Sequence, residues 1–152
     1  MKRILIITIL LLGCLASLAA QTALNNSADN IVGTYSGTQG NDRFNTKIVK
    51  LKDGTYRAQV VWLERDRDAK GNKLLDSRNP DKSLRSTPAD RIVLFSGLKY
   101  DAKNHRWGDT KIYDPQRGIR AKLAAEFTAD GRLKLKGSVM GISESVYWTK
   151  IE

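Results

Sequence analysis

Few side chains in this sequence could carry catalytic or metal-binding chemistry. His105 is the only histidine, and it lies in the turn-like sequence Lys-Asn-His-Arg, so a zinc site built from histidines is excluded. Cys14 is the only cysteine, which leaves the chain after it without a thiol nucleophile, a thiolate ligand or a disulfide. No Gly-x-Ser-x-Gly motif marks a serine nucleophile. The sequence therefore predicts no metal and no cofactor.

Carboxylates offer one route to an enzyme. Asp109 with Asp114, or with Glu126, could form an acid pair of the kind that hydrolyses glycosides. Nothing in the spacing of these acids requires such a pair. Acids on strands usually face solvent, which also argues against one. An enzyme acting on an ester or a sugar is thus a hypothesis without a motif, and the sequence favours a protein that is not an enzyme.

Aromatic and basic side chains are better candidates, because together they could hold an apolar or anionic amphipathic molecule. Tyr56, Trp62, Trp107 and Tyr113 would form a binding wall, and Lys111 would face an anionic head group. Lys111 alternates in step with Trp107 and Tyr113, which predicts that the three share one face of a strand. The alternative is that the aromatics are core residues. The sequence does not decide which face points inward.

These residues must be positioned by β-strands, because a two-residue period dominates the chain. Tyr56 and Trp62 fall on one predicted face, and Asp53-Gly54 and Asp130-Gly131 are typical hairpin turns. The predicted strands cover residues 31–36, 44–51, 55–63, 92–97, 107–113, 119–127, 133–139 and 145–150. Short connections between them predict an all-β, antiparallel, up-and-down barrel of about eight strands in a single domain.

The long polar segment 64–91 interrupts this pattern. It contains Pro80 and Pro88 and many charged residues. A connection of this length inside a compact domain is usually functional or mobile. Two interpretations stay open: a lid over one mouth of the barrel, or a mobile loop.

The N-terminus has the pattern of a signal peptide. Lys2 and Arg3 precede an apolar run over residues 4–12, and small residues follow up to Ala20. We expect residues 1–20 to be a signal peptide, 21–30 a flexible leader and 31–152 the barrel domain. Leu-Leu-Gly-Cys, ending at Cys14, also resembles a lipidation motif, so the alternative is a lipid anchor on the outer membrane. Either way, the sequence predicts export to the periplasm or beyond.

The chain is strongly basic. Its 26 lysines and arginines against 16 acids give a net charge of +10, which favours anionic partners, including a membrane surface. The alternative is that these charges only solvate the outer faces of strands. No nucleic-acid recognition module is visible, so nucleic acid is not a predicted partner. The oligomeric state cannot be read from the sequence.

Several motifs resemble one bacterial family. They are the segment from Asp76 to Asp81 with Asn79 and Pro80, the turn Ile112-Tyr113-Asp114-Pro115 with Gly118, and the closing residues Gly137 and Trp148. In order and spacing they are similar to the exported domain-of-unknown-function 2147 family over nearly the whole chain after the leader. The resemblance implies a lipocalin-like (calycin-type) barrel in the cell envelope that holds a small apolar molecule. It implies no catalytic residues.

Lipocalins also pack Gly-x-Trp on the first strand against a basic residue on the last. Gly33-Thr34-Tyr35 and Trp148-Thr149-Lys150 resemble that pair, with Tyr35 in place of the tryptophan. Gly137, on the predicted inward face, indicates a bend or a close contact.

The leading hypothesis is an envelope protein that binds a small apolar, lipid-like or anionic amphipathic molecule. The alternative is a non-enzymatic interaction or structural protein that acts through its basic outer face and the 64–91 loop.

Overall fold

The computed structural model describes residues 18–152. The predicted signal peptide therefore lies almost entirely outside the described residues, and Cys14 lies wholly outside them. Residues 18–25 are helical, and three short 3-10 helices follow: η1 (Ala28–Ile31), η2 (Lys82–Leu84) and η3 (Ala89–Arg91). Within residues 18–152, no helix has both the length and the apolar character needed to cross a membrane.

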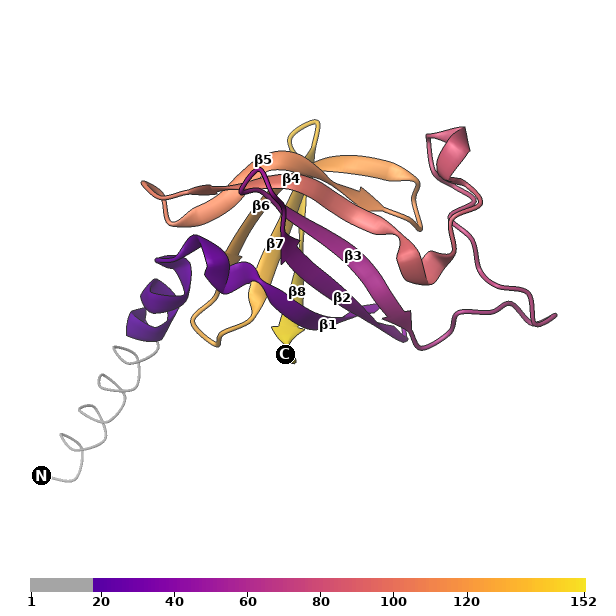
Figure 1. Ribbon diagram of the computed structural model, residues 1–152, viewed down its shortest axis with the longest axis horizontal. Coiled ribbons are helices and arrows are strands. Elements are labelled where there is room, and N and C mark those ends of the chain that lie inside the picture. Colours follow the sequence, from indigo (N-terminus) through magenta and orange to yellow (C-terminus); the bar gives the residue numbers. More distant parts are fainter. Residues whose placement is uncertain (1–17) are drawn as a thin grey trace, which may run out of the picture.

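Eight antiparallel strands form a closed barrel in which each strand pairs with the next along the chain (Figure 1). They are β1 (Gly33–Gln39), β2 (Asp42–Lys50), β3 (Tyr56–Leu63), β4 (Val93–Asp101), β5 (Arg106–Asp114), β6 (Ile119–Phe127), β7 (Leu133–Val139) and β8 (Ile142–Lys150). The predicted all-β, up-and-down barrel is confirmed. The predicted Asp-Gly hairpins are confirmed too, since Gly54 (φ 84°) and Gly131 (φ 81°) adopt the left-handed backbone that such turns require.

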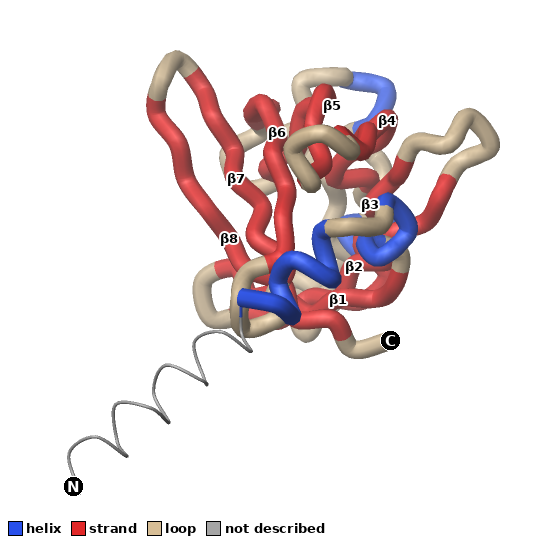
Figure 2. The backbone as a smooth tube through the Cα atoms, turned by 90° about the vertical axis from the view of Figure 1, so that its left-hand side faces the viewer, coloured by secondary structure: helices blue, strands red, loops and turns tan. Residues whose placement is uncertain are grey.

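Two pairs of neighbouring strands, β1 with β8 and β4 with β5, are hydrogen-bonded at only one end of the barrel, which we call the closed end. The ladder between β1 and β8 consists of the pairs Tyr35–Lys150 and Ser36–Thr149. The ladder between β4 and β5 covers only residues 99–101 and 106–108. Both ladders lie at the closed end. Figure 2 shows β7 and β8 running away from β1 and β2 toward the other end, which we call the open end.

The segment before β1 covers the closed end. The side-chain amide of Asn25 donates to the carbonyl of Phe127 (2.9 Å) and accepts from its backbone N–H (2.8 Å). Trp107 Nε1 donates to the carbonyl of Ala28 (3.1 Å), and Ile31 is fully buried. This differs from the flexible leader expected over residues 21–30: buried polar groups of the barrel end need partners, and the leader supplies them.

The hydrophobic core fills the closed half. Its largest fully buried residues include three tyrosines, a tryptophan and a phenylalanine, packed among aliphatic side chains. They are Tyr35, Tyr56, Tyr113, Trp107, Phe127, Ile31, Ile48, Leu98, Leu123, Leu133 and Leu135. Of these, Tyr113 lies outside the closed half, at the open end, where the segment between β3 and β4 covers it. The core also borders the open half, through Val60, Ile92, Leu94, Leu135 and Trp148.

Candidate ligand-binding cavity

The open half of the barrel encloses a cavity of about 860 Å³. All eight strands contribute to its wall, and most of the wall surface is apolar. The apolar lining includes Val60, Leu63, Ile92, Leu94, Ile112, Ala121, Leu135, Val139, Val146 and Trp148. Because the small residues Ala121 and Gly137 face each other from neighbouring strands, they leave room that larger side chains would fill.

Strand β8 shows the cavity most directly. Ile142, Glu144, Val146 and Trp148 alternate on its inward face, and all four line the cavity. Yet Val146, which lies well inside the strand and away from the hairpin turn, is 47% exposed. An inward aliphatic side chain of a filled barrel would be buried. The exposure of Val146 indicates that the space in front of it is hollow.

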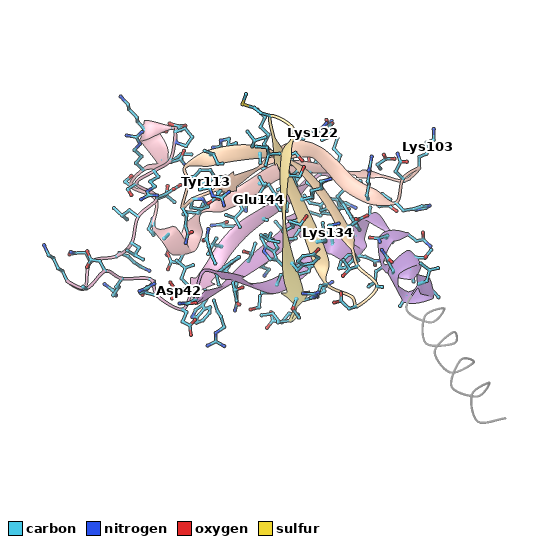
Figure 3. All side chains as sticks on the ribbon, turned by 180° about the vertical axis from the view of Figure 1, so that it is seen from behind. Asp42, Lys103, Tyr113, Lys122, Lys134 and Glu144 are labelled. Atoms are coloured by element: carbon cyan, nitrogen blue, oxygen red, sulfur yellow. The ribbon has the colours of Figure 1, made fainter. Side chains whose placement is uncertain are left out.

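One ion pair interrupts this apolar surface. Arg117, in the β5–β6 turn, places Nη1 2.8 Å from Oε2 of Glu144 and Nε 3.6 Å from Oδ2 of Asp114. The two carboxylates raise the pKa of Arg117, with the hydrogen bond to Glu144 as the largest cause. Figure 3 labels Glu144 on β8. The cavity thus offers a ligand apolar walls and one polar anchor.

Two further ion pairs stand at the mouth. Arg43 pairs with Glu64 (3.0 Å), and Arg65 pairs with Asp42. These pairs are solvent-exposed, so each stabilises the fold by little. They make the rim polar.

The segment between β3 and β4 forms one side of the mouth. Its residues Leu74, Leu75 and Ala89 line the cavity, as do residues 76–78. Internal bridges between Arg67 and Lys73 and between Leu75 and Pro88 give this segment structure of its own. Of the two interpretations left open for residues 64–91, the placement agrees with the one that puts the loop over a barrel mouth.

A buried carboxylate anchors this loop to the barrel. Asp76 accepts a hydrogen bond from the hydroxyl of Tyr113 (2.6 Å) and another from the side-chain amide of Asn79 (2.7 Å). Burial, followed by the bond to Asp76, raises the pKa of Tyr113. Asn79 in turn accepts from the backbone N–H of Asp81 and, through its carbonyl, from Arg85 Nε.

The predicted motif turn docks on the same loop. Asp114 Oδ1 accepts from the backbone N–H groups of Gln116 and Arg117, which closes the turn after Pro115. Gly118 has φ 67°, and a Cβ at that position would overlap the carbonyl oxygen of Arg78. Asn79 and Pro80 on one side and Asp114, Pro115 and Gly118 on the other therefore form one joint at the open end.

Of the five predicted ligand-binding residues, Tyr113 alone lies among the residues that line the cavity. Tyr56 and Trp107 are buried at the closed end, where the hydroxyl of Tyr56 donates to Asp29 (2.5 Å). Trp62 lies outside the barrel and is 43% exposed. Lys111 is exposed and lines a second, outer pocket between β4, β5, β6 and the loop.

Two β-bulges explain the wrong face assignments. In β3 the pairing with β2 slips between Val60 and Trp62, so that Trp62 turns outward and Leu63 inward. In β5, Trp107 pairs with Ala125, but the register slips at Asp109 (φ 63°), and Ile112 pairs with Ala121. Ala121 and Ala125 share the inward face of β6. The prediction that Lys111 shares a face with Trp107 is therefore wrong: Ile112 takes that place.

The three acids considered as a catalytic pair each contact a different cation. Asp109 pairs with Lys99 (2.6 Å), Asp114 with Arg117 and Glu126 with Lys134 (3.7 Å). Such pairs satisfy the carboxylates separately.

The predicted last strand, 145–150, left out Ile142 and Glu144. Both continue the two-residue alternation of Val146 and Trp148, so extending that alternation back to residue 142 would have included them.

The family model for "Uncharacterized protein conserved in bacteria (DUF2147)" matches residues 33–150. The chain belongs to the DUF2147 family. The match begins at β1 and ends with the last residue of β8, so it spans the entire barrel of this DUF2147 protein. The comparison with curated proteins found no match.

Among solved structures, the DUF2147 barrel is similar to protein HP1028 from the human pathogen Helicobacter pylori, which belongs to the lipocalin family. The two chains are 19% identical, the match covers 80% of this chain and 83% of that chain, and the TM-score is 0.62. This likeness establishes a lipocalin-like fold.

The predicted lipocalin-type contact between first and last strands is confirmed. Lys150 Nζ lies 5.9 Å from the ring centroid of Tyr35 and donates to the carbonyl of Asn30 (3.1 Å). Gly33 lies against the Lys150 side chain, where a Cβ would overlap it. Gly137 also makes the predicted close contact, since a Cβ there would stand 3.2 Å from Cβ of Ala121.

Proposed function

We propose that this protein is an exported, non-enzymatic binding protein of the bacterial cell envelope that holds one small apolar or amphipathic molecule in the open half of its barrel. The observation that carries the proposal is the hollow apolar interior in front of β8. A volume of about 860 Å³ lies within the range of small-molecule sites, roughly 300–1,000 Å³. Membership of the family and the lipocalin-like fold agree with such a role.

The distribution of polar groups favours an amphipathic ligand. An apolar tail would contact Val146, Leu135 and Leu94, which lie on three strands around the cavity. A polar head would reach Arg117 and Glu144 near the mouth, where the guanidinium donates to anions and the carboxylate accepts from donors. The ion pair would anchor the head and orient the ligand.

The N-terminal sequence supports the cellular location. Lys2 and Arg3, the apolar run over residues 4–12 and the small residues up to Ala20 form the pattern of an export signal. In the envelope, a carrier of lipid-like molecules would meet its ligands in membranes on either side.

A matched pair of variants tests the proposal. Val146→Trp places an indole inside the cavity, whereas Ser145→Trp places it on the outer face of the same strand. We expect a series of straight-chain fatty acids to raise the melting temperature of the delipidated wild type and of Ser145→Trp. At a hundredfold excess over Kd the stabilisation would be about 2.7 kcal/mol. Val146→Trp should lose the shift. A shift of equal size in Val146→Trp, or none in the wild type, would count against the cavity as the site.

A further inference from the structure

The β7–β8 hairpin ends in an apolar tip that has no place in the core. Its two-residue turn, Met140-Gly141, connects Val139 and Ile142, which pair directly. Met140 is 98% exposed and Ile142 is 74% exposed. Figure 2 shows this hairpin projecting from the barrel. A projecting methionine and isoleucine gain nothing in water, because the hydrophobic effect favours their burial.

The backbone of the turn makes the choice of methionine more informative. Met140 has φ 50° and Gly141 has φ 81°, the left-handed pair of a type I′ turn, in which asparagine or aspartate suits the first position. A methionine there departs from the preferred turn chemistry. Sequences accept such departures mainly at sites of function.

Lysines gather beside the tip, and in the part of the chain that the structure describes none of them forms a close ion pair with an acid. Lys111 on β5 pairs directly with Lys122 on β6, and Lys122 pairs with Ser138 on β7, one step before the hairpin turn. Among the ion pairs formed by residues 18–152, none includes Lys111, Lys122 or the neighbouring Lys136. Asp109, on the same strand as Lys111, forms its ion pair with Lys99, and the more distant Lys122 makes a smaller contribution to lowering the pKa of Asp109. Directly opposed like charges destabilise a sheet. An external anion bound between these lysines would reduce their repulsion.

The tip also belongs to the cavity. Val139, Met140 and Ile142 are lining residues of the same space that Val146 and Trp148 enclose. An apolar path therefore leads from the exposed tip to the inner wall. Figure 3 shows Lys122 next to the hairpin, whereas Lys103 lies at the opposite, closed end.

We infer that the β7–β8 tip, together with the lysines of β5, β6 and β7, docks the barrel on an anionic lipid surface. Met140 and Ile142 insert among the lipid chains, and Lys111, Lys122 and Lys136 contact the anionic head groups. Polybasic surfaces and apolar insertion act together in this way on membranes. Docking would bring the cavity to the bilayer, so that a lipid-like ligand could enter along the tip. Docking through this surface does not depend on which ligand the cavity holds.

Vesicle sedimentation with matched variants tests this surface. All proteins carry Cys14→Ala, so that no lipid anchor contributes, and circular dichroism verifies that each is folded. The tip variant is Met140→Asp with Ile142→Asp, and the charge variant is Lys111→Glu with Lys122→Glu. Their controls are Ile151→Asp and Lys103→Glu, exposed positions at the closed end.

We expect the wild type and both controls to bind phosphatidylcholine vesicles that contain phosphatidylglycerol, and to bind pure phosphatidylcholine far more weakly. Each test variant should bind the anionic vesicles at least about tenfold more weakly. Equal binding to both vesicle types, or losses no larger than those of the controls, would overturn the inference. So would tight binding of the wild type to polyphosphate without binding to vesicles, since the partner would then be a soluble polyanion.

The same proteins separate this inference from the proposed function. Fatty-acid uptake by the charge variant, measured by the melting-temperature shift, should equal that of the wild type. If the wild type takes up fatty acids but does not bind vesicles, only the docking surface is disproved. If it binds vesicles but takes up no fatty acid, only the proposed ligand is disproved.

Discussion

The contact between Tyr113 and Asp76 couples the cavity mouth to the barrel at the scale of single residues. The Tyr113 hydroxyl donates to a carboxylate that is 3% exposed and whose other side-chain donor is Asn79. Removing the hydroxyl leaves a buried acceptor with one donor fewer. Such losses cost about 1–3 kcal/mol.

We therefore expect Tyr113→Phe to lower the free energy of unfolding by about 1–3 kcal/mol, measured by urea denaturation. Tyr147→Phe is the matched control, because the Tyr147 hydroxyl belongs to a half-exposed ring stacked on Arg132. It should change stability by less than about 0.5 kcal/mol. Equal effects in the two variants would show that the Asp76 contact does not hold the loop.

Single residues also mark where prediction from the sequence ended. Tyr56 was predicted as part of the binding wall and is a core residue, which was the alternative for the aromatics, and alternation placed Trp62 and Lys111 on the wrong faces. Each error follows a β-bulge, at Val61 and at Asp109. A bulge adds one residue to one strand only, and that depends on the partner strand, which the sequence of a single strand does not contain.

Between elements, the joint of the β5–β6 turn with the β3–β4 loop determines the shape of the mouth. Gly118 carries both a left-handed backbone and a close approach to Arg78. The sequence motif identified the residues of this joint. It could not show that they touch, because the contact joins segments about forty residues apart, as the bond from Arg78 to the carbonyl of Gln116 demonstrates.

Gly118→Ala should destabilise the protein more than Gly54→Ala. Gly54 also has a positive φ (84°), but no atom lies within 4 Å of a Cβ there. The control thus measures backbone strain alone, about 1 kcal/mol, while Gly118→Ala adds the overlap with Arg78. Thermal unfolding gives both values. If the two variants have the same melting temperature, Gly118 is not packed against Arg78 of the loop.

At the scale of the whole molecule, acid should destabilise the barrel. Hydrogen bonds from Tyr56, Arg43 and Lys99 hold the pKa values of Asp29, Glu64 and Asp109 below their ordinary values. Because the folded values are depressed, this stability is fully present above the ordinary carboxyl range and is lost as the pH falls through the folded values. We expect the melting temperature, measured by circular dichroism, to fall steadily as the pH is lowered below about pH 4. A melting temperature that stays constant down to about pH 2 would contradict these ion pairs.

The whole fold was more predictable than its interior. Eight alternating segments and their turns are local patterns, so the barrel could be read from the sequence. Whether that barrel is filled depends on how far the strands diverge from the closed end. β1 and β8 pair at only two positions, both at the closed end, so the two strands separate toward the open end. Side chains such as Val146 would suit a solid core equally well.

The central claim is that the open half holds a small molecule, and native mass spectrometry of the protein purified from its envelope tests it most directly. A denatured sample gives the mass of the chain alone, and Val146→Trp serves as the blocked control. We expect the native wild type to carry an additional mass that is lost on denaturation and is absent from Val146→Trp. A bare mass in the native wild type, unchanged after incubation with envelope lipids, would contradict a ligand-binding barrel.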